Sequence, residues 1–230
     1  MKPTFTKEPG TWVMFIIAFI TGAVKAGWPD LITLLVFVSL SLFLMAKAPL
    51  ASFLKNRDKG LLPSIIALAV GGTAAGIYPV MIKPHIVLLY AAAAVLILLF
   101  FILLKKGFPM LSEACGMAIM GDVACIAASI NSSIQPNLYL WLFFFAFYFA
   151  SSFRVRFTIK RYRVLSGAYS GLIMLLSALM AYQGRLLFIS FLPLIEDVYA
   201  ALTGRRDDFK TLGIIETAKS IIFAVILIAI

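Results

Sequence analysis

The chain has 230 residues, of which 63% are hydrophobic and 13% are charged, and its formal net charge is +10. A water-soluble domain has roughly a quarter of its residues charged, and one this small cannot hide so much apolar surface in a single core. The composition therefore excludes a soluble globular protein. It predicts an all-α, polytopic transmembrane bundle that forms one domain over residues 1–230. Because the lysines and arginines fall in short loops between apolar runs, they indicate orientation in a lipid bilayer rather than nucleic-acid binding.

Turn residues divide the chain into apolar segments that approach the roughly 20 residues a spanning helix needs. Nine spans are predicted, and the eighth contains Glu196 and Asp197. In chain order they are 9–24, 31–46, 61–81, 86–104, 112–130, 137–153, 164–182, 185–202 and 212–230.

The distribution of positive charge predicts the orientation of these spans. If the N-terminus is cytoplasmic, sixteen Lys and Arg residues lie on the cytoplasmic side and three, Lys25, Lys83 and Arg185, lie outside. Such a bias is typical of cytoplasmic loops. We therefore expect a multi-pass protein of the inner membrane with a cytoplasmic N-terminus.

Cofactor motifs are missing from the sequence. Cys115 and Cys125 lie ten residues apart in one apolar segment, roughly 15 Å along a helix, too far for a disulfide within it. The only histidine is His85, and the sequence has no Cys/His cluster, Walker loop or GxGxxG. We expect neither a metal nor another cofactor, and we assign no catalytic residue.

Asp122 is the acidic residue that lies deepest in a predicted span, near the middle of the membrane. Ala118, Asp122, Cys125 and Ser129 recur at helical spacing and form a small, weakly polar face that should point into the bundle. A carboxylate at this depth is costly. It either binds a proton, cation or substrate, or it fixes the packing of a neighbouring helix. We expect it beside a polar cavity that is reached from the cytoplasm.

Five further acids lie in or near the cytoplasmic halves of predicted spans: Glu8, Glu113, Glu196, Asp197 and Glu216. For each acid alone, a structural role is the favoured interpretation. Glu113 suits a helix N-terminus, Glu216 is spaced to pair with Lys219, and Glu196 lies near Arg205 and Arg206 in the sequence. Together they predict a polar cytoplasmic vestibule, rimmed by Arg and Lys, with Asp122 at its floor.

The loops after the second and sixth spans are basic. We expect their side chains to converge over one cytoplasmic cavity and to bind the anionic head group of a lipid or isoprenoid. The alternative is that they are only orientation signals. The predicted substrate-binding residues are Asp122, Lys55, Asn56, Arg57, Arg156, Lys160, Arg161, Glu8, Glu113 and Glu216.

Two apolar patterns have mainly structural interpretations. Gly72 and Gly76 form a small-xxx-small motif, which predicts close contact between two helices. The sixth span is crowded with aromatic residues, from Phe143 to Phe149. These could line a groove for a lipid tail, but packing against other helices or lipid is the favoured interpretation.

The opening Lys7-Glu8-Pro9-Gly10-Thr11-Trp12 resembles the start of the YwiC-like family of bacterial membrane proteins. That start reads Lys/Arg-Glu-His-Gly-Ala-Trp, so Pro9 stands in place of the family's His. Further similarities are Arg161-Tyr162-Arg163-Val164 with Ala168-Tyr169, Phe191-Leu192-Pro193-Leu194, and the segment from Lys210 to Glu216. The resemblance covers most of the chain and implies an integral membrane protein, without an activity.

The architecture also resembles that of the UbiA-type intramembrane prenyltransferases, which have nine helices and Asp-rich motifs in the loops after spans two and six. Here the first loop offers only Asn56 and Asp58, and the second offers no acid. The chain therefore lacks the residues for a two-motif Mg²⁺ site. Three functions stay open: binding of a lipid or isoprenoid in a UbiA-like fold, transport of a small solute or ion by intramembrane carboxylates, and a structural role in a membrane complex.

Overall fold

The computed structural model describes residues 9–27, 29–131, 138–160 and 162–230. These residues form helices and no strand, which confirms the predicted all-α polytopic bundle. Eight helices, counted with their flanking 3-10 turns, are long and apolar enough to cross a membrane, and a shorter apolar helix covers Gly10–Ala26. The elements are α1 (Pro9–Ala26), α2 (Leu31–Asn56), η1 (Lys59–Leu61), α3 (Leu62–Ile82), α4 (Ile86–Lys105), α5 (Pro109–Asn131), α6 (Leu138–Lys160), α7 (Arg163–Tyr182), η2 (Leu186–Leu194), α8 (Ile195–Thr203) and α9 (Phe209–Ala229).

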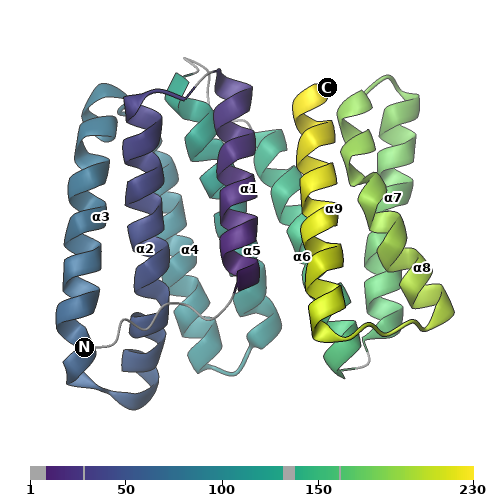
Figure 1. The fold of residues 1–230 in the computed structure, drawn as a ribbon, viewed down its shortest axis with the longest axis horizontal. Coiled ribbons are helices and arrows are strands. Elements are labelled where there is room, and N and C mark those ends of the chain that lie inside the picture. Colours follow the sequence, from purple (N-terminus) through teal and green to yellow (C-terminus); the bar gives the residue numbers. More distant parts are fainter. Residues whose placement is uncertain (1–8, 28, 132–137, 161) are drawn as a thin grey trace.

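Successive helices run in opposite directions, so the start of α1 and the α2–α3, α4–α5, α6–α7 and α8–α9 connections share one end of the molecule (Figure 1). We call α1–α5 the N-terminal group and α6–α9, with η2, the C-terminal group. Contacts of α5 with α6 and of α1 with α9 join the two groups.

Three spans differ from prediction by a large extension or by helix type, and the limits of the others shift by at most three residues. Helix α2 continues past Ala46 to Asn56, because Pro49 removes only one hydrogen bond and the surrounding residues favour a helix. Helix α6 continues past Phe153 to Lys160, so Arg154 and Arg156 are helical residues and not loop residues. The eighth span is a 3-10 segment, η2, followed by α8, and Pro193 lies where the helix type changes.

Small residues bring the helices of the N-terminal group together. A Cβ atom on Gly22 of α1 would lie 2.1 Å from the Ala124 carbonyl oxygen of α5, so only glycine permits this approach. Ser39 of α2 donates a hydrogen bond of 2.7 Å to the Gly72 carbonyl of α3. A Cβ atom on Gly76 would lie 2.9 Å from the Ser39 hydroxyl. The predicted close contact at Gly72 and Gly76 is thus confirmed.

Aromatic side chains fill the core of the C-terminal group. Phe143, Phe144, Phe147 and Tyr148 of α6 are buried, and the Phe147 ring stacks on Phe223 of α9 with centroids 4.2 Å apart. The aromatic residues of the sixth span on this face therefore serve packing. Charged side chains of the same helices gather nearer the end where α9 begins.

Candidate functional site

Lys219 of α9 is the centre of a buried ionic network in the C-terminal group. Its side chain is 6% exposed, and its ammonium donates a hydrogen bond of 2.7 Å to Glu216 and a shorter one to Asp197. Glu196 lies 3.6 Å from the same ammonium. One buried cation thus contacts three carboxylates, and the predicted pairing of Glu216 with Lys219 is confirmed.

Arg154 of α6 extends this network towards the α8–α9 connection. Its side chain is fully buried, and its Nη2 lies 3.3 Å from Glu196 and 2.6 Å from Asp207. Asp207 also pairs with Arg205 at 2.8 Å. Because two carboxylates share the guanidinium, Arg154 ties α6 to both ends of α8.

The break in the eighth span positions the acidic residues. Glu196 and Asp197 occupy the first turn of α8, directly after the 3-10 segment, where the helix dipole favours negative charge. Asp197 is fully buried and accepts a hydrogen bond of 3.2 Å from Ser170 of α7. The site therefore draws side chains from α6, α7, α8 and α9.

The network carries more negative than positive groups. Among the described residues, its four carboxylates are Glu196, Asp197, Asp207 and Glu216, and its three cations are Arg154, Arg205 and Lys219. A buried charge without a counter-charge is costly. One proton or one further cation would balance the group.

Metal binding has to be weighed against the position of Lys219. Ligand oxygens of Glu196, Asp197 and Glu216 lie within 4.8 Å of one another, close enough to hold an ion. The Lys219 ammonium already contacts all three carboxylates. The arrangement fits an ammonium group, and we assign no metal to it.

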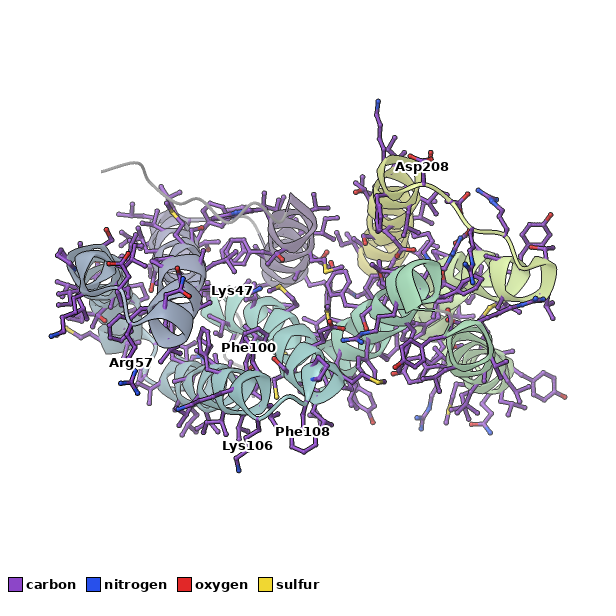
Figure 2. The ribbon with its side chains drawn as sticks, turned by 90° about the horizontal axis from the view of Figure 1, so that it is seen from below. Lys47, Arg57, Phe100, Lys106, Phe108 and Asp208 are labelled. Atoms are coloured by element: carbon purple, nitrogen blue, oxygen red, sulfur yellow. The ribbon has the colours of Figure 1, made fainter. Side chains whose placement is uncertain are left out.

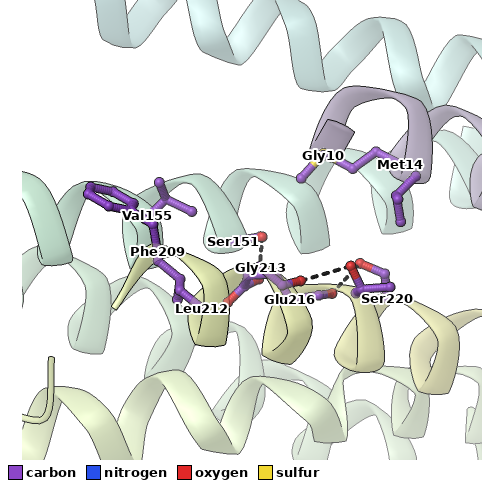
Figure 3. Close-up of a pocket in the computed structure, with 11 residues that line it drawn as sticks. Gly10, Met14, Ser151, Val155, Phe209, Leu212, Gly213, Glu216 and Ser220 are labelled. Carbon is purple, nitrogen blue, oxygen red and sulfur yellow. Dashed lines mark hydrogen bonds between the residues drawn. The ribbon is translucent and has the colours of Figure 1, made fainter. Parts of the chain in front are cut away.

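A cleft of about 460 Å³ lies beside the network, between α1, α6 and α9 (Figure 3). Its walls include Val13, Met14, Val155, Phe209 and Leu212. Its rim is exposed at Gly10, Phe209 and Gly213, whereas Ser151, Glu216 and Ser220 are buried at its floor. The cleft therefore combines apolar walls with a small polar floor.

Glu216 belongs to both the cleft and the network. One carboxylate oxygen accepts a short hydrogen bond from Ser151 in the cleft floor, and the other accepts from Lys219. Ser220 donates to the Glu216 backbone carbonyl at 2.8 Å, so the helix holds this floor in place (Figure 3). A ligand that contacts Glu216 in the cleft would thus bind a residue that is itself paired with the buried Lys219.

Asp122 lies apart from this site, in α5. It is 3% exposed and lies on a buried face with Ala118, Cys125 and Ser129, the face that the sequence predicts. The Trp141 side chain of α6 hydrogen-bonds to it, and its Oδ2 atom has no hydrogen-bond partner among the described residues. Asp122 does not line the cleft described here, so the structure does not place it at the floor of a shared vestibule.

Arg156 and Glu113 form a separate pair near the α5 N-terminus. Their two hydrogen bonds measure 2.7 and 2.6 Å, and the Glu113 side chain is 41% exposed. The structure therefore brings Arg156 to an acid of its own protein, and neither residue lines the cleft.

Asn56 and Arg57 are exposed at the end of α2, where the Arg57 backbone adopts a left-handed conformation. Figure 2 shows Arg57 on the opposite side of the molecule from Asp208, which precedes α9. The structure does not bring these residues to Arg156 or to the cleft. Glu8 and Arg161, and the side chains of Lys55 and Lys160, lie outside the described residues.

Sequence reasoning did not select Arg154, Asp197 and Lys219 as binding residues. The Glu216–Lys219 spacing was one signal for the network, and the two acids inside the eighth span were another. Glu196 was expected near Arg205 or Arg206, but its cationic partners are Arg154 and Lys219. Arg154 was assigned to a loop, so the sequence did not predict that its side chain is buried in the bundle.

The fold and its apolar surface define a multi-pass α-helical integral membrane protein. The model of the YwiC-like protein family matches residues 5–128, which is more than half of the chain. The chain belongs to the YwiC-like family. No curated protein and no solved structure matches it. The matched region reaches into α5 and includes Asp122, whereas the ionic network lies beyond it.

Proposed function

We propose that the protein is a membrane carrier for a small solute, with the cleft between α1, α6 and α9 as its binding site. The single observation that carries this proposal is the double role of Glu216, which forms part of the cleft floor and pairs with Lys219. A solute that changes the charge or hydration at Glu216 acts directly on the buried network. Intramembrane charges of this kind commonly belong to substrate or proton pathways.

The surplus of carboxylates among the described residues of the network supports coupling to a proton. If a solute and a proton compete for the same negative charge, the binding of one releases the other, as exchange across a membrane requires. The interrupted eighth span supports the same interpretation, because broken helices in transporters often carry the groups that bind substrate and ions.

We further propose that the protein lies in the inner membrane with its N-terminus in the cytoplasm. The support is the sequence bias of sixteen Lys and Arg residues against three. With this orientation, the rim of the cleft at Gly10 and Phe209 faces the cytoplasmic leaflet.

A second candidate is a protein that binds a lipid or isoprenoid in the same cleft. The apolar walls favour it, because Val13, Met14 and Leu212 suit a hydrocarbon chain. An anionic head group, however, would meet the carboxylate of Glu216 at the floor. The described lining residues include no Lys or Arg.

Proteoliposomes that contain the purified protein and an internal pH dye test the carrier proposal. A panel of amines, alcohols and carboxylates is added outside under an imposed pH gradient. We expect at least one class to move protons only when the protein is present, and Glu216→Gln to abolish this flux. Glu113→Gln is the matched control, since it removes the same charge outside the cleft. Proton movement that is independent of solute and protein would contradict the proposal.

A further inference from the structure

We propose that the cleft selects an amphipathic monocation, a protonated amine on an apolar body, with Glu216 as its counter-ion. This inference rests on the proposed carrier function and names its substrate class. It follows from the hydrogen-bonding character of the floor, the Lys219 ammonium that Glu216 already binds and the shape of the walls.

The described hydroxyl groups that line the cleft all donate their hydrogens to other groups of the protein. Thr217 donates to the Gly213 carbonyl at 2.8 Å, and Ser220 donates to the Glu216 carbonyl at 2.8 Å. A carbonyl oxygen only accepts, so the direction of both bonds is fixed. Ser151 donates in the same way to the Glu216 carboxylate.

These side chains therefore present only acceptor lone pairs to a ligand. A serine or threonine hydroxyl has one hydrogen and two lone pairs, and an ionised carboxylate has lone pairs alone. A carboxylate or phosphate ligand would find no side-chain donor among the described polar residues of the lining. An ammonium group, with three donors and no acceptor, matches what the floor offers.

Lys219 shows which chemistry Glu216 accepts. Its ammonium is held between Glu216 and Asp197 in the interior of the bundle. The second oxygen of Glu216 accepts a hydrogen bond from Ser151, which also lines the cleft. A ligand amine would bind this oxygen as Lys219 binds the first, and its charge would balance the extra carboxylate of the network.

The walls define the rest of the ligand. Val13 and Met14 of α1, Val155 of α6, and Phe209 and Leu212 of α9 surround the floor with apolar surface. The volume of about 460 Å³ lies within the range of small-molecule pockets. A compact aromatic or aliphatic body is therefore expected next to the amine.

Three probes with one apolar body test the charge preference: 4-phenylbutylamine, 4-phenylbutanol and 4-phenylbutyrate. Their binding to the protein in nanodiscs is measured by saturation-transfer NMR and calorimetry, with empty nanodiscs subtracted. We expect the amine to bind at least about tenfold more tightly than the alcohol, and the carboxylate not to bind. Glu216→Gln should reduce amine affinity about tenfold and leave alcohol affinity unchanged. Glu113→Gln should alter neither.

A second variant keeps the test decisive if Glu216→Gln does not fold. A Cβ atom on Gly213 meets no atom within 4 Å, so Gly213→Leu adds a side chain at the rim without a clash. We expect it to block the amine, whereas Ala218→Leu, on the same helix and outside the cleft, does not. Equal binding of amine and alcohol, tighter binding of the carboxylate, or amine binding unaffected by Gly213→Leu would overturn the inference.

The outcomes also separate this inference from the carrier function. Selective amine binding without proton flux driven by any solute class would leave the inference standing and refute the carrier. Proton flux driven by a neutral or anionic solute, without selective amine binding, would support the carrier and refute the preference for an amine.

Discussion

The helices of the N-terminal group and those of the C-terminal group are held together by different kinds of interaction. In the N-terminal group, glycines and small side chains allow close contact, and hydroxyl groups bond to backbone carbonyls, as Ser39 does to Gly72. In the C-terminal group, Lys219 and Arg154 hold α6, α8 and α9 together through buried carboxylates. Shape complementarity gives one fixed arrangement. Ion pairs can exchange partners or protons, so the C-terminal group has the chemistry for a change of state.

The largest expected effect comes from the removal of the central cation. Lys219→Met leaves Asp197 and Glu216 buried without their ammonium, which should cost about 3–5 kcal/mol of unfolding free energy. Unfolding in mixed detergent micelles measures it. The double variant Lys219→Met with Asp197→Asn should recover part of the loss, since one unpaired charge is removed. A loss below about 1 kcal/mol would show that the network is not a main source of stability in the C-terminal group.

The steric counterpart in the N-terminal group is Gly22. Its missing Cβ would lie 2.1 Å from the Ala124 carbonyl oxygen, so Gly22→Ala forces α1 away from α5. We expect a loss of about 1–3 kcal/mol in the same assay. Gly10→Ala on the same helix is the control, because a Cβ there meets no atom within 4 Å. Equal effects of the two substitutions would show that the close contact at Gly22 does not stabilise the N-terminal group.

Much of the fold could be predicted from the sequence, because hydropathy and turn residues report directly on what lipid demands of a helix. The nine segments follow from this pattern. The extra turns of α2 and α6 could not be predicted from this pattern, since polar residues such as Arg154 end an apolar run without ending a helix. Helix ends depend on neighbouring elements as well as on local hydropathy.

The site was harder to predict than the fold. The spacing of Glu216 and Lys219 on one helix revealed their pairing, because that contact is local. The contacts of Lys219 with Asp197 and of Arg154 with Asp207 join different segments, and a single sequence does not show which helices lie together. Arg57 was grouped with Arg156 by loop position alone, and the fold separates their helices.

Asp122 sharpens the comparison, because it is the one buried carboxylate in the described part of the N-terminal group. Trp141 hydrogen-bonds to it, and its Oδ2 atom has no partner in the described part of the chain, so it joins no ionic network of those residues. Asp122→Asn keeps the shape and an acceptor for Trp141, and should change the unfolding free energy by about 1 kcal/mol or less. Asp122→Leu should cost more, since the indole loses its partner. An Asn variant as damaging as Lys219→Met would show that Asp122 is ionised and paired.

The smallest expected effects are at two helix N-caps outside the spans, one in each group. Asp208 caps α9: hydrogen bonds from Thr211, and from the Lys210 amide, lower the pKa of its carboxyl. Asp30 caps α2: although burial opposes it, bonds of 2.8 Å from the Thr33 amide and hydroxyl lower the pKa of its carboxyl.

A lowered folded-state pKa fixes the sign of the pH dependence at both caps. The stabilisation is fully present above the ordinary aspartate pKa of about 3.9, and it is lost as the pH falls through the lower, folded-state pKa. Hydrogen exchange of the Thr33 and Thr211 amides should therefore speed up in acid beyond its intrinsic pH dependence. Asp30→Asn and Asp208→Asn retain a capping oxygen that does not titrate, so they should remove this extra dependence. Because each cap acts on one helix turn, acid should speed up amide exchange equally at the start of α2 and at the start of α9. Acid-dependent exchange confined to α9 would mean that the ionic network, and not the cap, controls that helix end.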